Sequence, residues 1–343
     1  MRPDKLPFIT VVMPVLNEER FVTDVLDELL GQNYPGDRFE IIVADGGSTD
    51  RTRQEVATAA QIHPQIILLD NPRRFPGSGR NVGFRNGKGD YFLVIDGHCQ
   101  IGNDRLLKNV VECFEKTGAD CLCRPQPFIL PDRPDMQKAI GLARSSPLGH
   151  SSKSFIHSNR EGWVSPVSAG CAYRREVFEQ IGFVDESFDA CEDVEFNYRV
   201  EKAGLKSYFC PSIAVSYHPR ESLYGLWRQL VRYGEGRVRF MRKHPETMNL
   251  DMFLPALIIP GLAGGLPLGA LSGIALGIYL VIAGAYFTLI LFESIRISMG
   301  SAGLAAKLVA AFLVIHVSLG WSLIRALLQR DKPLQFCRNR ESN

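Results

Sequence analysis

The chain has 343 residues and a formal net charge of +2, with 22% charged and 45% hydrophobic residues. This length can bury one or two domain cores, and the nearly balanced charge argues against a surface built to bind nucleic acid. Eight cysteines are scattered without a CxxC pair, which favours reduced thiols of a cytosolic domain. The first residues lack the pattern of a signal peptide, so we expect none.

The first hundred residues alternate between expected strands and helices. Apolar runs without helical period predict four strands, over residues 8–15, 39–45, 65–70 and 91–96. The apolar spacing between residues 20 and 30 predicts a helix. Such alternation is typical of an α/β fold with a mostly parallel, doubly wound sheet. Because ligands bind beyond the carboxyl ends of parallel strands, we expect the strand-end residues Asn17, Asp45 and Asp96 to line one crevice.

Asp45 is followed by two glycines, which let a backbone come close to a ligand. We expect its carboxylate to accept hydrogen bonds from a base or a ribose. The alternative is that Asp45 caps the next helix. Asp50 is better placed for capping, which leaves Asp45 for a ligand.

A segment rich in glycine and proline, residues 71–83, carries Arg73, Arg74 and Arg80. Guanidinium groups match phosphate oxygens, so we expect Arg80 to contact a nucleotide phosphate. The alternative for all three arginines is a solvated surface loop. Residues 77–83 also imitate a dinucleotide-binding fingerprint, but they do not directly follow a strand, so we discount a dinucleotide-dependent oxidoreductase.

Asp96 and His98 follow the fourth strand with one residue between them, so a carboxylate and an imidazole can face one ligand. Mg²⁺ or Mn²⁺ in such sites completes its shell with phosphate oxygens and water. We therefore expect a divalent cation here, although the isolated pattern also fits a structural turn. His218 is a further candidate for a metal or phosphate contact, or an ordinary loop histidine.

The second half predicts a loop and strand over residues 162–174, helices over 175–181 and 192–203, and strands over 205–210 and 214–217. Glu192 and Asp193 open the second of these helices. Carboxylates at a helix N-terminus offset the macrodipole, an alternative that fits Glu195 better than Asp193. We expect Asp193 to act as a general base beside a buried Glu192.

A basic stretch within residues 220–243 precedes the apolar tail and places Gln229 and Arg232 on one helix face beside Tyr233. An interfacial amphipathic helix is the alternative for this stretch. Residues 253–292 carry no charged side chain. A membrane span needs about 20 apolar residues, so this run suits two spans. A third run, residues 304–328, carries only Lys307, His316 and Arg325.

The sequence leaves the membrane topology open. The positive-inside rule places the basic stretch in the cytoplasm. Three spans would then put the tail outside, whereas Arg330, Lys332, Arg338 and Arg340 favour the inside. Either one segment is re-entrant or interfacial, or the first run is divided differently. We expect a cytosolic domain (1–245), a membrane region with two to three or more apolar helices (246–330) and a basic tail (331–343), in the cytoplasmic (inner) membrane.

Five motifs together are highly specific: Val12-Met13-Pro14-Val15-Leu16-Asn17-Glu18, Val43-Ala44-Asp45-Gly46-Gly47-Ser48-Thr49-Asp50, Gly79-Arg80-Asn81-Val82-Gly83, Asp96-Gly97-His98 and Glu192-Asp193. On these motifs, residues 8–245 resemble the family 2 inverting glycosyltransferases, which have a GT-A nucleotide-sugar-binding fold. The motif that contains Asp45, together with the apolar tail, is most similar to bacterial exopolysaccharide enzymes.

The resemblance implies roles for the donor-side residues. Asp45 would read the uracil, and Pro14, Asn17 and Glu18 belong to the nucleotide-binding motif. Asp96 would contact the ribose and the metal. His98 stands where the family has the second aspartate of its D-x-D motif. Gly46 replaces a commonly acidic position, which removes one possible polar contact.

The resemblance also implies that Asp193 is the catalytic base. Gln229, Arg232 and Tyr233 resemble the Q-x-x-R-W element against which an acceptor sugar stacks. Tyr233 replaces the tryptophan, which weakens the case for processive polymer synthesis.

The resemblance implies inverting transfer of one sugar from a UDP-sugar to a lipid-linked glycan at the membrane, in exopolysaccharide biosynthesis. Glucose is the first candidate for the sugar, and Mg²⁺ or Mn²⁺ is the expected cofactor. The alternatives are a polyprenyl-phosphate glycosyltransferase, a processive polysaccharide synthase and, from another class, a nucleotide-binding membrane adaptor without catalysis.

Overall fold

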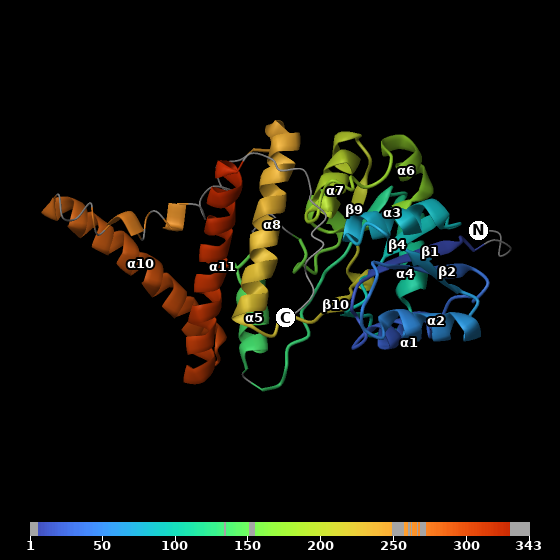
Figure 1. The fold of residues 1–343 in the computed structure, drawn as a ribbon, viewed down its shortest axis with the longest axis horizontal. Coiled ribbons are helices and arrows are strands. Elements are labelled where there is room, and N and C mark those ends of the chain that lie inside the picture. The colour runs from blue at the N-terminus through green and yellow to red at the C-terminus, as the bar shows by residue number, and fades with distance from the viewer. Residues whose placement is uncertain are drawn as a thin grey trace. The chain divides into compact units, whose positions relative to one another are not determined.

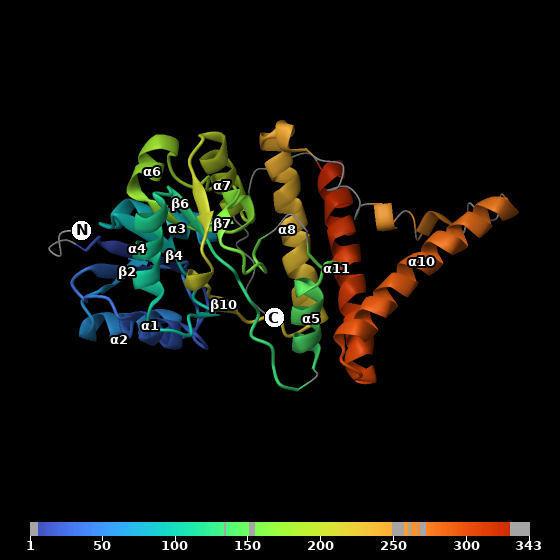
Figure 2. The same ribbon diagram turned by 180° about the vertical axis from the view of Figure 1, so that it is seen from behind.

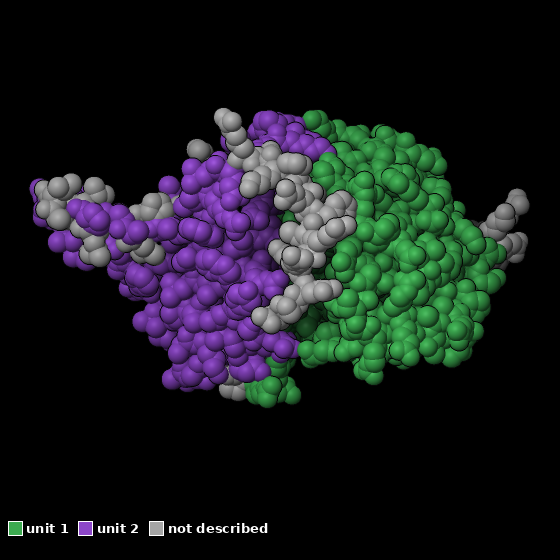
Figure 3. All heavy atoms as spheres, viewed as in Figure 1, with its two compact units in different colours: residues 1–133, 144–220 green, residues 134–143, 221–343 purple. Residues whose placement is uncertain are grey.

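The computed structural model describes residues 6–133, 135–150, 155–248, 257–259, 261, 263–265, 267 and 272–329. The chain forms two compact units, residues 1–133 with 144–220 and residues 134–143 with 221–343, coloured green and purple in Figure 3. The predicted limit of the cytosolic domain near residue 245 concerns the membrane border and stays a prediction.

The first unit is built on an eight-stranded sheet with the strand order β3-β2-β1-β4-β8-β6-β9-β7 (Figure 1). The strands are β1 (Ile9–Val15), β2 (Phe39–Asp45), β3 (Ile66–Asp70), β4 (Tyr91–Val94), β6 (Cys121–Cys123), β7 (Gly162–Trp163), β8 (Gly170–Arg174) and β9 (Ser207–Phe209). The first four pair in parallel, β6 pairs in parallel with β9, and β7 and β8 run antiparallel to their neighbours. The predicted mostly parallel sheet is confirmed.

Helices cover both faces of this sheet. They are α1 (Val22–Leu30), α2 (Thr52–Ile62), α3 (Pro76–Asn86), α4 (Leu106–Thr117), α6 (Arg175–Ile181) and α7 (Glu192–Lys202), with the short helices η1 (Pro166–Ser168) and η2 (Pro211–Ile213). Side chains of a strand alternate between faces. Val11 and Met13 of β1 therefore join a core with α1 and α4, whereas Val12 joins a second core with α3, α6 and α7. β5 (Cys99–Gln100) and β10 (Ser216–Tyr217) form a separate antiparallel pair.

Helix α3 was not among the predicted elements, because its glycine content argued against a helix. These glycines let α3 pack closely on β1. A Cβ atom on Gly83 would lie 2.3 Å from Cγ1 of Val12, and one on Gly79 would lie 2.8 Å from Cβ of Pro14. Pro76 is tolerated because it stands in the first turn. Arg80 thus lies on a helix beside β1 rather than on a surface loop.

The second unit contains most of α5 (Met136–Ser145), then α8 (Leu223–Lys243), η3 (Pro245–Thr247), α10 (Gly273–Ile297) and α11 (Ala302–Leu328). Within the described part of the chain, two helices, α10 and α11, are long and apolar enough to cross a membrane. Helix α10 overlaps the second half of the apolar run predicted over residues 253–292, and α11 matches the run predicted over residues 304–328. The first half of the predicted hairpin and the basic tail lie largely outside the described residues.

The seven cysteines that the structure describes are all buried thiols. This agrees with the expectation of reduced thiols.

Candidate functional site

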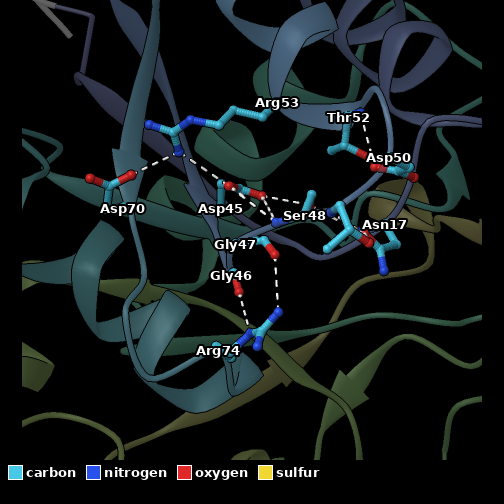
Figure 4. A network of polar contacts seen from close by, with 11 residues as sticks. Asn17, Asp45, Gly46, Gly47, Ser48, Asp50, Thr52, Arg53, Asp70 and Arg74 are labelled. Atoms are coloured by element: carbon cyan, nitrogen blue, oxygen red, sulfur yellow. Dashed lines mark hydrogen bonds and ion pairs between the residues drawn. The ribbon is translucent and has the colours of Figure 1, made fainter. Parts of the chain in front are cut away.

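The loop after β2 is a polar network centred on Asp45 (Figure 4). The buried Asp45 carboxylate accepts hydrogen bonds from the Ser48 hydroxyl at 2.6 Å and from the Ser48 N–H at 3.1 Å. Nη1 of Arg53 also donates to Asp45 at 3.1 Å and lies 2.7 Å from Asp70. Asp45 has protein partners here, because the tight turn brings Ser48 onto its carboxylate, and its expected contact with a base stays a prediction. Asp50, which precedes the N-cap residue Arg51, accepts from the N–H of Thr52, the first residue of α2, at 3.0 Å.

The loop after β1 is joined to this network by Asn17. Its side-chain oxygen accepts from the N–H of Thr49 at 2.8 Å, and its own N–H donates to the Ser48 hydroxyl at 3.0 Å. Asn17 has a φ of 57°, which asparagine tolerates better than most residues. Pro14 lies under α3 at Gly79. The structure therefore brings together the predicted nucleotide-binding residues of β1 and β2.

Two arginines of the segment 71–83 have protein partners. Arg74 donates to the carbonyl oxygens of Gly46 and Gly47 at 3.0 and 3.2 Å, so it holds the β2 loop. Arg73 pairs with Glu186 at 2.8 Å. The short turn before α3 directs each side chain to a neighbouring loop, and the phosphate role considered for them stays a prediction.

Asp96, two residues beyond β4, receives a hydrogen bond from the Tyr217 hydroxyl at 3.0 Å. Arg124 supports that hydroxyl at 3.1 Å and also donates to the carbonyl oxygen of Val94 at 3.0 Å. Burial acts to raise the pKa of Asp96, yet the positive charges of His98, Arg80 and Arg124 bring it below its usual value. The Asp96 carboxylate is therefore ionised at neutral pH.

Arg124 and Tyr217 were missed in the sequence. Arg124 is only 2% exposed, and among the described residues its Nε and Nη1 have no hydrogen-bond partner. One signal was available, because Arg124 directly follows β6, whose carboxyl end lies at the same sheet edge as that of β4. Tyr217 was placed in a predicted strand, but its partner across the fold could not be read from the pattern.

The imidazole of His98 is oriented by Glu18, whose Oε1 lies 2.9 Å from Nδ1. Burial lowers the pKa of His98, but the Glu18 carboxylate and Asp96 raise it above its ordinary value. Histidines that bind metals usually donate their second ring nitrogen to a carboxylate in this way. With Nδ1 bound to Glu18, Nε2 is the nitrogen left for a cation.

The described residues contain no group of three or more histidine, cysteine, aspartate or glutamate side chains that could hold a metal ion. Asp96, His98 and His218 therefore do not form one. The ring of His218 stacks on Phe21 with centroids 5.2 Å apart. An ionised carboxylate and an imidazole with a carboxylate partner still fit a Mg²⁺ or Mn²⁺ ion that takes its other ligands from phosphate and water.

The start of α7 meets α3 at an ion pair. Nη1 of Arg80 lies 3.0 Å from Oε1 of Glu192, with the two side chains 14% and 7% exposed. Burial acts to lower the pKa of Arg80, but the charges of Glu192, Asp193 and Asp96 raise it overall. Arg80 therefore lies among the acidic groups at the ends of β4 and α7, and it binds Glu192 here. Glu192 is buried as predicted, whereas Asp193 is exposed.

Cys191, directly before α7, has a φ of 62°, a backbone conformation that side chains rarely adopt. The turn presents the exposed Asp193, whose Oδ1 accepts the N–H of Val194 at 2.9 Å. Glu195 is fully buried and pairs with Arg199 at 3.1 Å along the helix. The two acids therefore differ in their surroundings, and the expected role of Asp193 as a base stays a prediction.

The predicted acceptor residues lie on α8, in the second unit. Nε2 of Gln229 donates to the Tyr233 hydroxyl at 3.2 Å, and Arg232 is exposed. Residues three and four apart on a helix are neighbours, so the predicted shared face is present.

Comparisons with known proteins agree with these features. The family model "Glycosyl transferase family 2" matches residues 10–182. The succinoglycan biosynthesis protein ExoA of Rhizobium meliloti is 30% identical over 315 residues, which cover 91% of this chain and 92% of that protein. A dolichyl N-acetyl-alpha-D-glucosaminyl phosphate 3-beta-D-2,3-diacetamido-2,3-dideoxy-beta-D-glucuronosyltransferase of Methanococcus voltae is 29% identical over 241 residues, 69% of this chain and 74% of that protein.

Among solved structures, the mannosyltransferase PcManGT from Pyrobaculum calidifontis, in complex with GDP-Man and Mn²⁺, matches with a TM-score of 0.61 and 19% identity. The match covers 91% of this chain and 87% of that one. At this level of identity the likeness concerns the fold, and it confirms the predicted GT-A architecture.

Proposed function

The chain belongs to glycosyl transferase family 2, and from that premise we propose that it transfers one sugar from a UDP-sugar to a hydroxyl of a lipid-linked glycan. Glucose is the first candidate for this sugar. The transfer inverts the anomeric carbon and serves exopolysaccharide biosynthesis. The enzyme would be attached to the cytoplasmic membrane with its first unit in the cytosol. The similarity to a succinoglycan biosynthesis protein over nearly the whole chain supports this pathway class.

The observation that carries the proposal is the position of Arg80. Its guanidinium binds Glu192 and is influenced by both Asp96 and Asp193. The charge of Arg80 is therefore coupled both to the donor-side residue at the end of β4 and to the candidate base on α7. A transferase needs such a gathering, because the diphosphate leaves one side of the anomeric carbon as the acceptor attacks the other.

The donor would bind across the β1 and β2 loops, with the uracil at Asp45 and the ribose at Asp96. Asp45 would have to share its carboxylate with Ser48 and Arg53, so donor binding rearranges that network. A Mg²⁺ or Mn²⁺ ion held by Asp96 and His98 would supply positive charge beside the departing diphosphate. Arg80 can add a further positive charge if it turns from Glu192.

Asp193 would take the proton of the acceptor hydroxyl while that oxygen bonds to the anomeric carbon. The bond from this carbon to the diphosphate oxygen breaks at the same time, and UDP leaves with the electron pair. General-base catalysis is worth about 10²–10⁴-fold. We expect Asp193→Asn to lose at least about a hundredfold in turnover while it still binds UDP. Near-wild-type turnover would remove Asp193 from this role.

The donor is tested with the full chain in detergent, screened against UDP- and GDP-sugars for nucleotide release with and without Mn²⁺. Release of UDP from one UDP-sugar supports the proposal. The solved PcManGT complex contains GDP-Man, so selective GDP release is the competing outcome and would reject the UDP assignment. No release from any donor would favour a nucleotide-binding adaptor.

The Methanococcus relative is named for transfer to a dolichyl-linked sugar phosphate, which supports a lipid-linked sugar as the acceptor of this chain. A polyprenyl phosphate without a sugar is the second acceptor class, and one variant separates it from the first. If a polyprenyl phosphate itself were the acceptor, little proton removal would be needed. Asp193→Asn would then keep full activity on polyprenyl phosphate, which separates the two possibilities. Product length on a gel tests processive synthesis.

A further inference from the structure

Helix α11 has the length and composition of a membrane span, but its packing argues for another placement. Helices α8 and α11 lie side by side and run in the same direction (Figures 1 and 2). A Cβ atom on Gly234 would lie 1.7 Å from the Ser322 hydroxyl, so the helices are in close contact there. Two turns further on, Arg242 donates to the carbonyl oxygens of Ala326 and Gln329 at 2.8 Å each.

This packing ties α11 to a highly charged helix. The sequence of α8 contains six basic residues and one acidic residue, Glu235, which pairs with Arg325 of α11 at 3.5 Å. Four of the basic side chains are exposed: Arg228, Arg232, Arg242 and Lys243. Charged side chains are costly in hydrocarbon. Because α8 lies along α11, α11 could cross the bilayer only by taking these charges with it.

Helix α10 has different properties. Only 6% of the most apolar 18-residue stretch of α10 is buried, against 39% of the corresponding stretch of α11. Residues 273–292 precede its first charged residue, Glu293, and roughly 20 residues at about 1.5 Å each match the bilayer's hydrocarbon thickness of about 30 Å. Glu293 pairs with Arg296 at 2.7 Å, so the charges of α10 are gathered in its last turns. Helix α10 therefore has the dimensions and the exposed apolar surface of a span.

We infer that α10 crosses the membrane, whereas α11 lies beside α8 in the cytosolic headgroup region. The exposed apolar side chains of α11, Trp321, Leu327 and Leu328, would enter the boundary of the acyl chains, a depth that tryptophan favours. The basic residues of α8 would contact anionic lipid headgroups. The inference rests on the proposed membrane attachment but not on the transfer chemistry.

This arrangement resolves the conflict between the apolar runs and the basic tail. If α10 leads from the far side of the membrane to the cytosolic side, the chain is in the cytosol where α11 begins. Both ends of α11 then lie on that side, and so does the tail with Arg330, Lys332, Arg338 and Arg340. The positive-inside rule is satisfied at α8 and at the tail together.

The test labels single cysteines in the full chain with a membrane-impermeant maleimide, in intact cells and in inside-out vesicles. Cys337 is replaced by serine, and the seven described cysteines are buried. The labelled variants are Ser272→Cys before α10, Met299→Cys between α10 and α11, and Asn343→Cys at the chain end. We expect labelling of Met299→Cys and Asn343→Cys only in inside-out vesicles, and of Ser272→Cys only in cells.

Labelling of Met299→Cys and Asn343→Cys from opposite sides would mean that α11 crosses, and the inference would fall. Labelling of Ser272→Cys and Met299→Cys from the same side would equally overturn it, because α10 would not cross. Release of the wild-type chain by alkaline carbonate would instead contradict the membrane attachment itself. Sugar transfer is also measured on each variant, so that a failure of the proposed transferase function is distinguished from a failure of the proposed topology.

Discussion

At the scale of single residues, Glu192 and Asp193 are neighbours in sequence with different surroundings. Glu192 is buried against Arg80, whereas Asp193 is exposed at the start of α7. Removing one partner of a buried ion pair leaves an uncompensated charge and costs about 3–5 kcal/mol. We therefore expect Glu192→Leu to lower the melting temperature of the first unit by roughly 10 °C, and Asp193→Asn to leave it unchanged. Thermal melts followed by the fluorescence of Trp163 measure both.

The matched control replaces both members of the pair. The double variant Arg80→Met with Glu192→Leu removes the two charges together, so most of the lost stability should return. If the double variant is no more stable than Glu192→Leu, the pair does not explain the loss. Unchanged melting of Glu192→Leu itself would show that Glu192 has no structural role.

The strand-end rule located residues that share a region, but it could not assign their partners. Asn17, Asp45 and Asp96 could be grouped from the sequence because parallel strands end at one edge of a sheet. The contacts Asp45–Arg53, Asp96–Tyr217 and Arg80–Glu192 join residues from 8 to 121 positions apart. Such pairings depend on how helices and loops pack over the sheet, and no local pattern contains that information.

At the scale of elements, the packing of α3 on β1 depends on glycine. The nearest atom to a Cβ would lie in β1 at 2.3 Å for Gly83 and 2.8 Å for Gly79, and in Glu192 of α7 at 3.2 Å for Gly77. Forcing extra atoms into a packed interior costs about 1–3 kcal/mol. We expect stability to fall in the order Gly83→Ala, Gly79→Ala, Gly77→Ala, with the first losing most because Val12 is fixed in β1. Chemical denaturation of the three variants in detergent gives the order.

Two controls sharpen this series. Gly303→Ala makes the same change in the first turn of α11, where no atom lies within 4 Å, and should cost nothing. Val12→Ala removes the methyl groups that a Cβ on Gly83 would meet. The double variant Val12→Ala with Gly83→Ala should therefore lose less stability than the two single variants lose together. Strict additivity, or equal losses across the glycine series, would contradict the close approach of α3 to β1.

The same glycines explain why α3 was not expected. Glycine within a helix is unfavourable by about 0.5–1 kcal/mol relative to alanine, so a glycine-rich segment argues for a loop. Tertiary packing overrides that preference here, because only glycine admits the backbone of α3 so close to Val12 and Pro14. Helix α7 and the strands β1, β2 and β3 were predictable, because their local patterns and their packing agree.

At the scale of the whole molecule, the chain consists of two compact units with separate cores. The candidate donor residues belong to the first unit, and the predicted acceptor residues Gln229, Arg232 and Tyr233 belong to the second. A ligand stabilises the unit that binds it. The three tryptophans make this measurable, because Trp163 lies in the first unit and Trp227 and Trp321 lie in the second.

We expect UDP with Mn²⁺ at 100 times its Kd to stabilise the first unit by about 2.7 kcal/mol, which raises its melting temperature by about 5–10 °C. The variant Trp227→Phe with Trp321→Phe reports this shift through Trp163, while Trp163→Phe should show an unchanged transition for the second unit. Chelation of Mn²⁺ should reduce this shift in melting temperature, because Asp96 and His98 would lose the ion that links them to the diphosphate. ADP in place of UDP is the nucleotide control. A shift in both variants would mean that the units melt together, and none in either would remove the donor site from the β1 and β2 loops.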